Sequence, residues 1–134
     1  MRILTVDDNE AHVYALTRIL EHNGFEVFSA HNAKDALEIA RREHPTVALL
    51  DIFLPDKNGF ELCASLRSDP QTKDIAVIFH SATANTASAR DEADLAGASA
   101  FLTYPIDPDD LLIVVRGAVE RARERRRTRK NLPN

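Results

Sequence analysis

Short apolar runs alternate with longer amphipathic segments along the chain. The apolar runs occupy residues 3–6, 25–30, 46–54, 75–80 and 98–103, and β-branched and aromatic residues are common in them. Between these runs, apolar residues recur three or four positions apart, which is the period of a helix with one buried face. The pattern therefore predicts five strands, each followed by a helix.

The polar residues around the amphipathic segments predict where the helices begin. Asn32 and Asn58 each precede such a segment and have an acid three residues later, as at the start of many helices. Asp107 is followed by a proline and two acids, which favours a helix start at residue 108. Helices are therefore predicted over residues 10–22, 32–43, 58–68 and 84–96 and from residue 108 onward.

Strands that alternate with helices predict an α/β fold, in which a doubly wound parallel sheet has helices on both faces. Residues 46–54, TVALLDIFL, are the most apolar stretch of the chain and suit a central strand that is covered on both sides. Because crossovers between parallel strands are right-handed, few topologies remain. We expect five strands in the flavodoxin-like order 2-1-3-4-5, together with five helices.

Polar residues gather where the predicted strands end. Asp7 and Asp8 follow the first strand, Asp51 ends the third, Ser81 follows the fourth and Tyr104 follows the fifth. In open sheets of this kind, functional residues lie beyond the carboxyl ends of the strands. Because the first and third strands are neighbours in the expected order, the three acids are predicted to meet in one crevice.

Three carboxylates in one crevice indicate a particular chemistry. Like charges at close range repel, so one group takes up a proton or a hard cation binds among them. Carboxylate and carbonyl oxygens, together with waters, are the ligands that Mg²⁺ prefers. A carboxylate can also act as a nucleophile towards phosphorus, and phosphoryl transfer otherwise needs positioning and charge neutralisation. The pattern therefore indicates a magnesium-dependent phosphoacceptor.

The composition fits one domain of ordinary size. Of 134 residues, 44% are apolar and 28% are charged, and no apolar run approaches the roughly 20 residues of a membrane span. The apolar run in the opening MRILTVDDNE is too short for a signal peptide. The single Cys63 cannot form an internal disulfide. We expect a cytoplasmic protein that does not contact a membrane.

Charge is distributed unevenly along the chain. Residues 121–134 carry seven Lys or Arg and one acid, which gives a net charge of +6. Residues 1–120 carry ten Lys or Arg and twenty acids, which gives a net charge of −10. The acidic body argues against nucleic-acid binding by the domain itself. The basic segment is a solvated helical extension, the start of a linker to a second domain, or an arm that meets nucleic acid or an acidic partner. We expect a domain over residues 1–120 that is followed by this extension or linker.

Four segments resemble the receiver domain of two-component response regulators, the family that includes the bacterial chemotaxis regulator. They read TVDDNE, LLDIFLPDKNGFEL, VIFHSA and GASAFLTYPID. The DD pair, the D-x-x-x-P-x-x-x-G run from Asp51 to Gly59 and the Ser-Ala pair at Ser81 hold the family's spacing, and the resemblance covers roughly residues 2–120. It implies a bacterial signalling phosphoprotein and not a metabolic enzyme.

The resemblance implies roles for the acids. Asp51 is the implied phosphoacceptor, which takes a phosphoryl group from a histidine kinase or a phosphotransfer protein. Asp8, Asp51 and the backbone carbonyl of Phe53 are the implied ligands of Mg²⁺, and Asp7 orders the waters of the metal. The implied cofactor is therefore magnesium alone.

The resemblance also implies a switch. Ser81 matches the residue whose hydroxyl turns towards the phosphoryl group, and Phe101 matches the aromatic residue that then swings inward. The fourth helix, fifth strand and fifth helix form the face that meets a downstream protein or an attached output domain, and a homodimer can use this face or the C-terminal helix. Phe53 and Thr83 match positions that influence water access to the phosphoryl group, with ordinary loop packing and helix entry as the alternative.

Tyr104 departs from the family's pattern, which nearly always has lysine at this position. That lysine pairs with the phosphoacceptor, whereas a phenol carries no positive charge at neutral pH. Either phosphorylation persists with weaker coupling to the signalling face, or the chain is a pseudo-receiver that acts as an interaction module without phosphorylation. The phenol either faces the acids or lies on the surface. The Tyr104–Pro105 bond is expected to be cis, as its counterpart is in the family.

Two other functions fit the sequence less well. A phosphatase with an aspartyl nucleophile needs a second acid where this chain has Phe53, and a flavodoxin-type cofactor binder needs a phosphate-binding loop that the chain lacks. His80 is predicted to pack within its strand and Cys63 to be a small buried residue. The remaining histidines show no ligand spacing and are His12, His22, His31 and His44.

Overall fold

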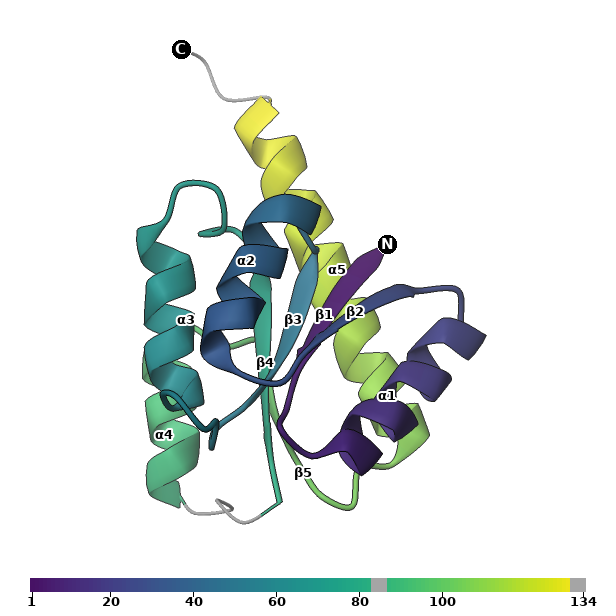
Figure 1. Ribbon diagram of the computed structural model, residues 1–134. Coiled ribbons are helices and arrows are strands. Elements are labelled where there is room, and N and C mark those ends of the chain that lie inside the picture. Colours follow the sequence, from purple (N-terminus) through teal and green to yellow (C-terminus); the bar gives the residue numbers. More distant parts are fainter. Residues whose placement is uncertain (83–86, 131–134) are drawn as a thin grey trace.

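The sheet of the protein has five parallel strands. The computed structural model describes residues 1–82 and 87–130. Its strands are β1 (Arg2–Val6), β2 (Glu26–Ala30), β3 (Val47–Asp51), β4 (Ala76–Ser81) and β5 (Ala100–Thr103). They lie in the order β2-β1-β3-β4-β5, and all neighbouring strands run parallel (Figure 1). The predicted strand order is therefore confirmed.

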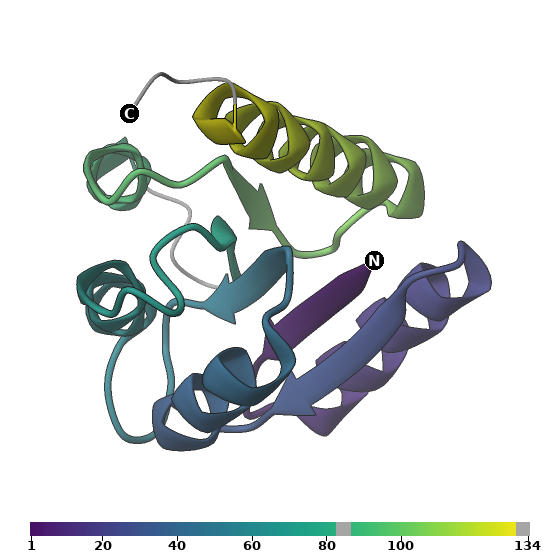
Figure 2. The ribbon, with the colours of Figure 1, turned by 90° about the horizontal axis from the view of Figure 1, so that it is seen from above.

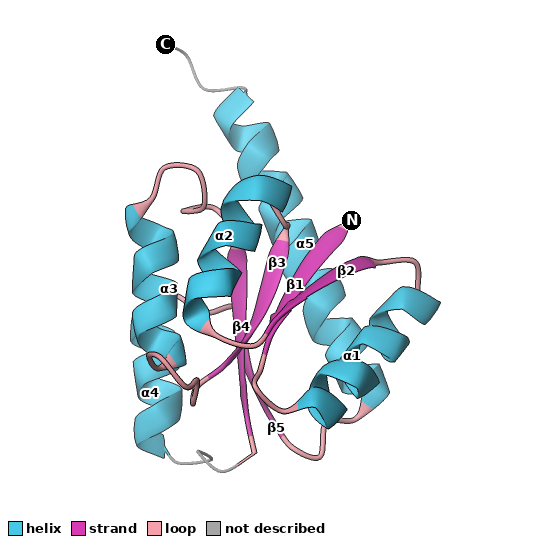
Figure 3. Ribbon diagram, viewed as in Figure 1, coloured by secondary structure: helices cyan, strands magenta, loops and turns pink. Residues whose placement is uncertain are grey.

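Helices cover both faces of this sheet. In the described part of the chain they are α1 (Glu10–His22), α2 (Ala33–Glu43), α3 (Gly59–Ser68), α4 (Ala87–Leu95) and α5 (Pro108–Lys130), shown in cyan in Figure 3. Figure 2 shows α1 and α5 on one face and α2, α3 and α4 on the other. The predicted doubly wound fold is confirmed. The first residues of the helix predicted over residues 84–96, like Thr83, lie outside the described residues.

Two hydrophobic clusters hold the helices on the sheet. Leu50 and Phe79 belong to the cluster under α2, α3 and α4, whereas Leu49 and Ile78 belong to the cluster under α1 and α5. All four side chains are buried, so neighbouring residues of β3 and β4 enter opposite clusters. Burial on both faces explains why these strands read as unbroken apolar runs.

Asparagine caps fix the starts of the helices that follow the first three strands. The caps are Asn9, Asn32 and Asn58, and each side chain accepts the backbone N–H three residues later. Each bond satisfies an amide that has no partner within the first turn of its helix, which favours one start point. The loops at the carboxyl edge of the sheet are therefore held at both ends.

The third strand is shorter than the apolar stretch at residues 46–54. β3 ends at Asp51, and the chain then returns so that the Gly59 N–H donates to the Ile52 carbonyl oxygen at 2.7 Å. The approach is so close that a Cβ on residue 59 would lie 2.4 Å from the Asp51 carbonyl oxygen. Glycine is the residue that allows this contact, and the contact places Asp51 at the edge of the sheet.

The last helix continues beyond the sheet without a break. α5 runs to Lys130, and its buried face reaches Ala122, after which the described side chains are exposed. The final turns, in yellow in Figure 1, project past the edge where the first strand begins. Arg125 and Arg126 help to line a cavity of about 140 Å³ at that edge. Among the residues described, no helix is long and apolar enough to cross a membrane.

Candidate functional site

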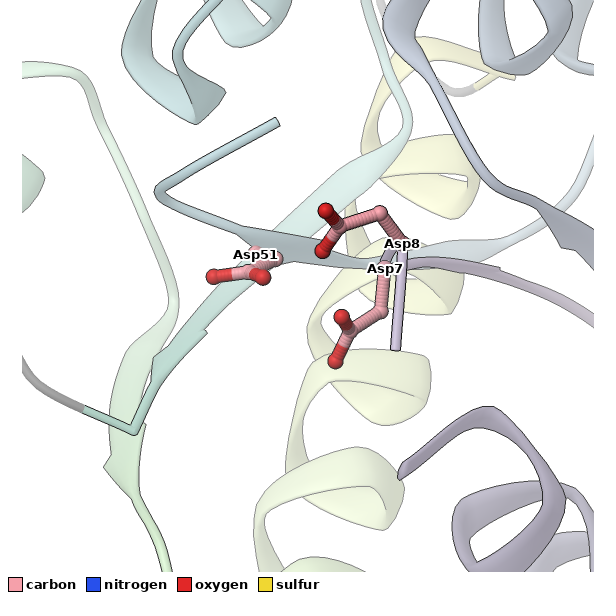
Figure 4. A group of neighbouring side chains, drawn as sticks. All are labelled: Asp7, Asp8 and Asp51. Atoms are coloured by element: carbon pink, nitrogen blue, oxygen red, sulfur yellow. The ribbon is translucent and has the colours of Figure 1, made fainter. Parts of the chain in front are cut away.

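Three carboxylates meet at the carboxyl edge of the sheet (Figure 4). Asp7 and Asp8 follow β1, Asp51 ends β3, and the two strands are hydrogen-bonded neighbours. A carboxylate oxygen of each acid lies within 4.8 Å of those of the other two. Asp7 is only 1% exposed, Asp51 is half-buried and Asp8 is exposed. The structure thus brings together the acids that the sequence predicted to meet.

Backbone amides orient two of these carboxylates. Asp7 Oδ1 accepts the N–H of Asn9 at 2.9 Å, and Asp51 Oδ1 accepts the N–H of Phe53 at 3.2 Å. The N–H of Asp7 itself donates to the Ala30 carbonyl oxygen at 3.1 Å, which continues the pairing of β1 with β2. Because these donors belong to loops that are held at both ends, the acids have defined directions.

The cluster changes the protonation of Asp51. The pKa of Asp51 is raised to about 7, with burial as the largest cause, followed by the nearby charge of Asp7. The charge of Asp8 adds to the increase, and the hydrogen bond from Phe53 opposes it. The physical reason is that a third negative charge is costly where water is limited and two carboxylates are already present. Near neutral pH, Asp51 is therefore divided between its protonated and ionised forms.

An open cleft of about 240 Å³ gives access to the acids. It is lined by Asp7, Asp8, Asn9, His12, Asp51, Phe53, Ser81 and Ala82. The ring of Phe53 is exposed at its mouth. Carboxylate and hydroxyl oxygens are hard donors of the kind that Mg²⁺ accepts. The three acids therefore form a donor set that fits a magnesium ion.

The two residues implied to act as a switch lie on neighbouring strands. Ser81 ends β4, is buried and borders the cleft. Phe101 is half-buried on β5, and the Arg90 guanidinium of α4 lies 5.2 Å from its ring centroid. The Ser81 carbonyl oxygen accepts the N–H of Tyr104 at 3.2 Å. The backbone therefore joins the end of β4 to the segment that carries Tyr104.

Tyr104 is partly buried and turns its hydroxyl into the interior. Its hydroxyl is buried, and it has no hydrogen-bond partner among the residues that the structure describes. The pKa of Tyr104 is raised well above its ordinary value by burial and then by the charges of Asp7 and Asp51. The phenol is therefore neutral and close to the acids. The bond from Tyr104 to Pro105 is cis, which confirms the expectation from the sequence.

Two histidines complete the surroundings of Asp7. His12 Nδ1 lies 3.1 Å from Asp7 Oδ2, and the His12 ring stacks on Tyr104 with centroids 4.0 Å apart. His80 is buried in β4, which confirms its predicted packing, but its Nδ1 also lies 3.9 Å from Asp7 Oδ2. Burial lowers the pKa of His80 to about 4, so this imidazole is neutral at pH 7.

The sequence did not single out His12 as a site residue. The histidines show no ligand spacing along the sequence, whereas the partner of His12 is an acid at the end of the preceding strand. The available signal was its place in the first turn of a helix that begins directly after Asp7 and Asp8. Side chains in that turn can reach back to the strand end.

Comparison with known proteins gives a consistent result. A sequence model of the response regulator receiver domain matches residues 3–116. The chain is 39% identical over 111 residues to protein PilH of Pseudomonas aeruginosa, and the aligned region covers 83% of this chain and 91% of PilH. It is also 39% identical over 115 residues to the response regulator PleD of Caulobacter vibrioides, where the aligned region covers 86% of this chain but only 25% of PleD.

A solved structure has the same architecture. The CheY-like response regulator receiver domain protein from Methanospirillum hungatei is 31% identical and superimposes with a TM-score of 0.84. The match covers 92% of this chain and 97% of that one. Both the sequence match and the structural match extend over most of the molecule. The chain therefore belongs to the response regulator receiver domain family, whose members are signalling modules of two-component systems and not metabolic enzymes.

Proposed function

We propose that this receiver domain is a phosphoacceptor and that Asp51 takes the phosphoryl group from a histidine kinase or a phosphotransfer protein. The observation that carries the proposal is the half-buried Asp51 carboxylate, which borders an open cleft within 4.8 Å of two other acids. An Asp51 oxygen attacks phosphorus, the bond from phosphorus to the donor's histidine nitrogen breaks, and the released imidazole takes up a proton. The product is an acyl phosphate on Asp51.

Magnesium is the proposed cofactor of this reaction. Asp8, Asp51 and the Phe53 carbonyl would bind the ion directly, and Asp7 would bind it through water. Asp7 suits the water-mediated role because the Asn9 N–H and His12 Nδ1 already contact its two oxygens. When bound, the ion supplies positive charge that offsets the acids and the incoming phosphoryl oxygens.

The proposed output is a change on the face formed by α4, β5 and α5. Ser81 would contact the phosphoryl group, and Phe101 would respond on the neighbouring strand. Two large apolar side chains are available for a partner, since Leu95 of α4 is 89% exposed and Ile113 of α5 is 69% exposed. The partner is a downstream protein, an attached output domain or a second copy of the chain, and the C-terminal helix is a further route to a dimer.

Residues 1–120 are the proposed receiver unit, and residues 121–134 are proposed as a basic helical extension or the start of a linker. The buried face of α5 ends at Ala122 while the helix continues to Lys130, which supports this division. So do the curated relatives, because the chain spans nearly all of PilH but only a quarter of PleD. The proposed location is the cytoplasm, where a histidine kinase presents its phosphohistidine.

Incubation with acetyl phosphate and Mg²⁺ tests the proposed function. We expect one phosphoryl group per chain by intact mass, and we expect Asp51→Asn to take up none because an amide is a poor nucleophile. Glu38→Gln makes the same charge change on the exposed side of α2 and should be labelled like the parent. A parent that takes up no phosphate would refute the proposal and favour an interaction module that partners recognise without phosphorylation.

Tyr104→Lys is expected to speed the phosphorylation of Asp51 by acetyl phosphate or to enlarge the structural response to it. An ammonium in place of a neutral phenol is worth about 1 kcal/mol at this partly buried site, which corresponds to roughly fivefold in rate. Labelling kinetics measure the rate, and amide hydrogen exchange measures the response. Tyr14→Lys makes the same change at a tyrosine that is 65% exposed on α1 and should alter neither. An unchanged rate together with an unchanged response in Tyr104→Lys contradicts the prediction.

A further inference from the structure

We propose that His12 is a positioning residue of this receiver site: it fixes the Asp7 carboxylate and holds Tyr104 against the acidic pocket. The inference rests on the proposed function, because it assigns a role within the same site. It concerns a residue of α1 and the segment after β5, which the fold brings together although they are far apart in the chain.

The first part of the argument is the contact between His12 and Asp7. His12 Nδ1 lies 3.1 Å from Asp7 Oδ2, and the other Asp7 oxygen accepts the Asn9 N–H at 2.9 Å. Asp7 is 1% exposed, so solvent supplies little of its hydrogen bonding. Two contacts from the start of α1 therefore determine the direction of a carboxylate that is proposed to order the waters of the metal.

The second part is the contact between His12 and Tyr104. The two rings are stacked at 16° with centroids 4.0 Å apart, and the ring of His80 meets Tyr104 edge-on at 5.7 Å. The phenol ring therefore contacts two imidazoles, one from α1 and one from β4. Stacked and edge-on aromatic pairs favour one ring orientation, so these neighbours restrain the side chain of Tyr104.

The third part is the place of His12 relative to the cleft. His12 lines the cleft with Asp7, Asp51 and Ser81, whereas Tyr104 does not line it. The phenol hydroxyl is buried behind this wall, and the charges of Asp7 and Asp51 act on it. After β5, this chain thus has an aromatic pair, His12 and Tyr104, that contacts Asp7 through His12.

The chain offers a direct reporter for the test. It has two tyrosines and no tryptophan, so in a Tyr14→Phe background the intrinsic fluorescence comes from Tyr104 alone. His12→Leu removes both the ring and its nitrogen, and His12→Phe keeps a ring that can stack but loses the contact to Asp7. His22→Leu, at the exposed end of the same helix, is the matched control. The readouts are acrylamide quenching of Tyr104 and Mg²⁺ affinity by calorimetry.

We expect His12→Leu to increase the quenching of Tyr104 about threefold or more and His12→Phe to leave it near the parental value. Both variants should weaken Mg²⁺ binding by about tenfold, which is the lower end of the effect of removing a residue that orients a metal site. His22→Leu should change neither quantity. Parental quenching in His12→Phe together with increased quenching in His12→Leu separates the loss of stacking from a general loss of structure. The circular dichroism of each variant checks its fold.

Several outcomes overturn the inference. Parental quenching in His12→Leu shows that His12 does not hold Tyr104, and parental Mg²⁺ affinity in His12→Phe shows that it does not fix Asp7. A parent that binds no Mg²⁺ removes the proposed role of Asp7 as well. A failure of this inference is distinguishable from a failure of the proposed function, because neither the quenching of Tyr104 nor the Mg²⁺ affinity requires phosphate transfer. If His12 behaves as expected but the parent takes up no phosphate, the proposed function fails and the positioning role stands.

Discussion

Magnesium is expected to bind about tenfold more tightly at pH 8 than at pH 6, because the metal and a proton compete for Asp51. With the pKa of Asp51 raised to about 7, roughly a tenth of this carboxyl group is ionised at pH 6 and roughly nine tenths at pH 8. In the proposed site only the ionised form binds the metal, so binding is expected to weaken as the pH falls through 7. His80, with its pKa lowered to about 4, stays neutral over this range. Calorimetric titration at the two pH values measures the effect.

Substitution of single acids identifies which carboxylates contribute to Mg²⁺ binding and to its pH dependence. Asp8→Ala is expected to weaken Mg²⁺ binding by at least about tenfold at both pH values, because the proposed site loses a direct ligand. Asp51→Asn should also weaken binding, and it should remove most of the pH dependence because the titrating group is gone. Glu38→Gln should match the parent throughout. Parental affinity in Asp8→Ala, or equal affinity of the parent at pH 6 and pH 8, contradicts this picture of the site.

Gly59→Ala is expected to destabilise the fold by about 3 kcal/mol, because a side chain has no room at the start of α3. The new Cβ would lie 2.4 Å from the Asp51 carbonyl oxygen and 3.0 Å from Ile52 Cα. Both are backbone atoms that cannot rotate away, so the segment after β3 has to shift. The loss corresponds to roughly 10 °C in Tm for a chain of this size. Thermal and urea denaturation measure it.

Gly117→Ala is the matched control for that substitution. Gly117 lies within α5, and a Cβ there would meet only the Arg121 guanidinium at 3.7 and 3.8 Å. Alanine at this position is expected to stabilise the protein by up to about 1 kcal/mol, because glycine has the larger conformational freedom to lose in a helix. If Gly59→Ala also leaves the stability unchanged, the return of the chain to Asp51 is not as constrained as the contacts indicate.

The acidic part of the site could be predicted because it depends on strand ends. Asp7, Asp8 and Asp51 each stand where an apolar run stops, and the carboxyl ends of neighbouring parallel strands share one edge of the sheet. The strand order was open to prediction because few right-handed topologies fit five such units. The end of β3 was clearer in the structure, since the return to Gly59 stops the strand at Asp51 although apolar residues continue to residue 54.

The aromatic part of the site could not be predicted in the same way. His80 appeared in the sequence as one more residue of a buried strand, which it is, and His12 as an isolated histidine on a helix. Their shared contact with Asp7 depends on the rotation of α1 against the sheet and on side-chain directions at the ends of β4 and β5. Local spacing carries no information on these quantities.

By itself, the sequence determined the alternation of five strands and five helices, the meeting of three acids and the identity of residue 104 as a tyrosine. These features follow from apolar periodicity and from residue identity, which are local properties of the chain. Only the tertiary structure decided that the phenol of Tyr104 is buried, that His12 stacks on it and that the pKa of Asp51 is raised to about 7. Stacking, burial and charge repulsion depend on distances between side chains from different elements, and packing sets those distances.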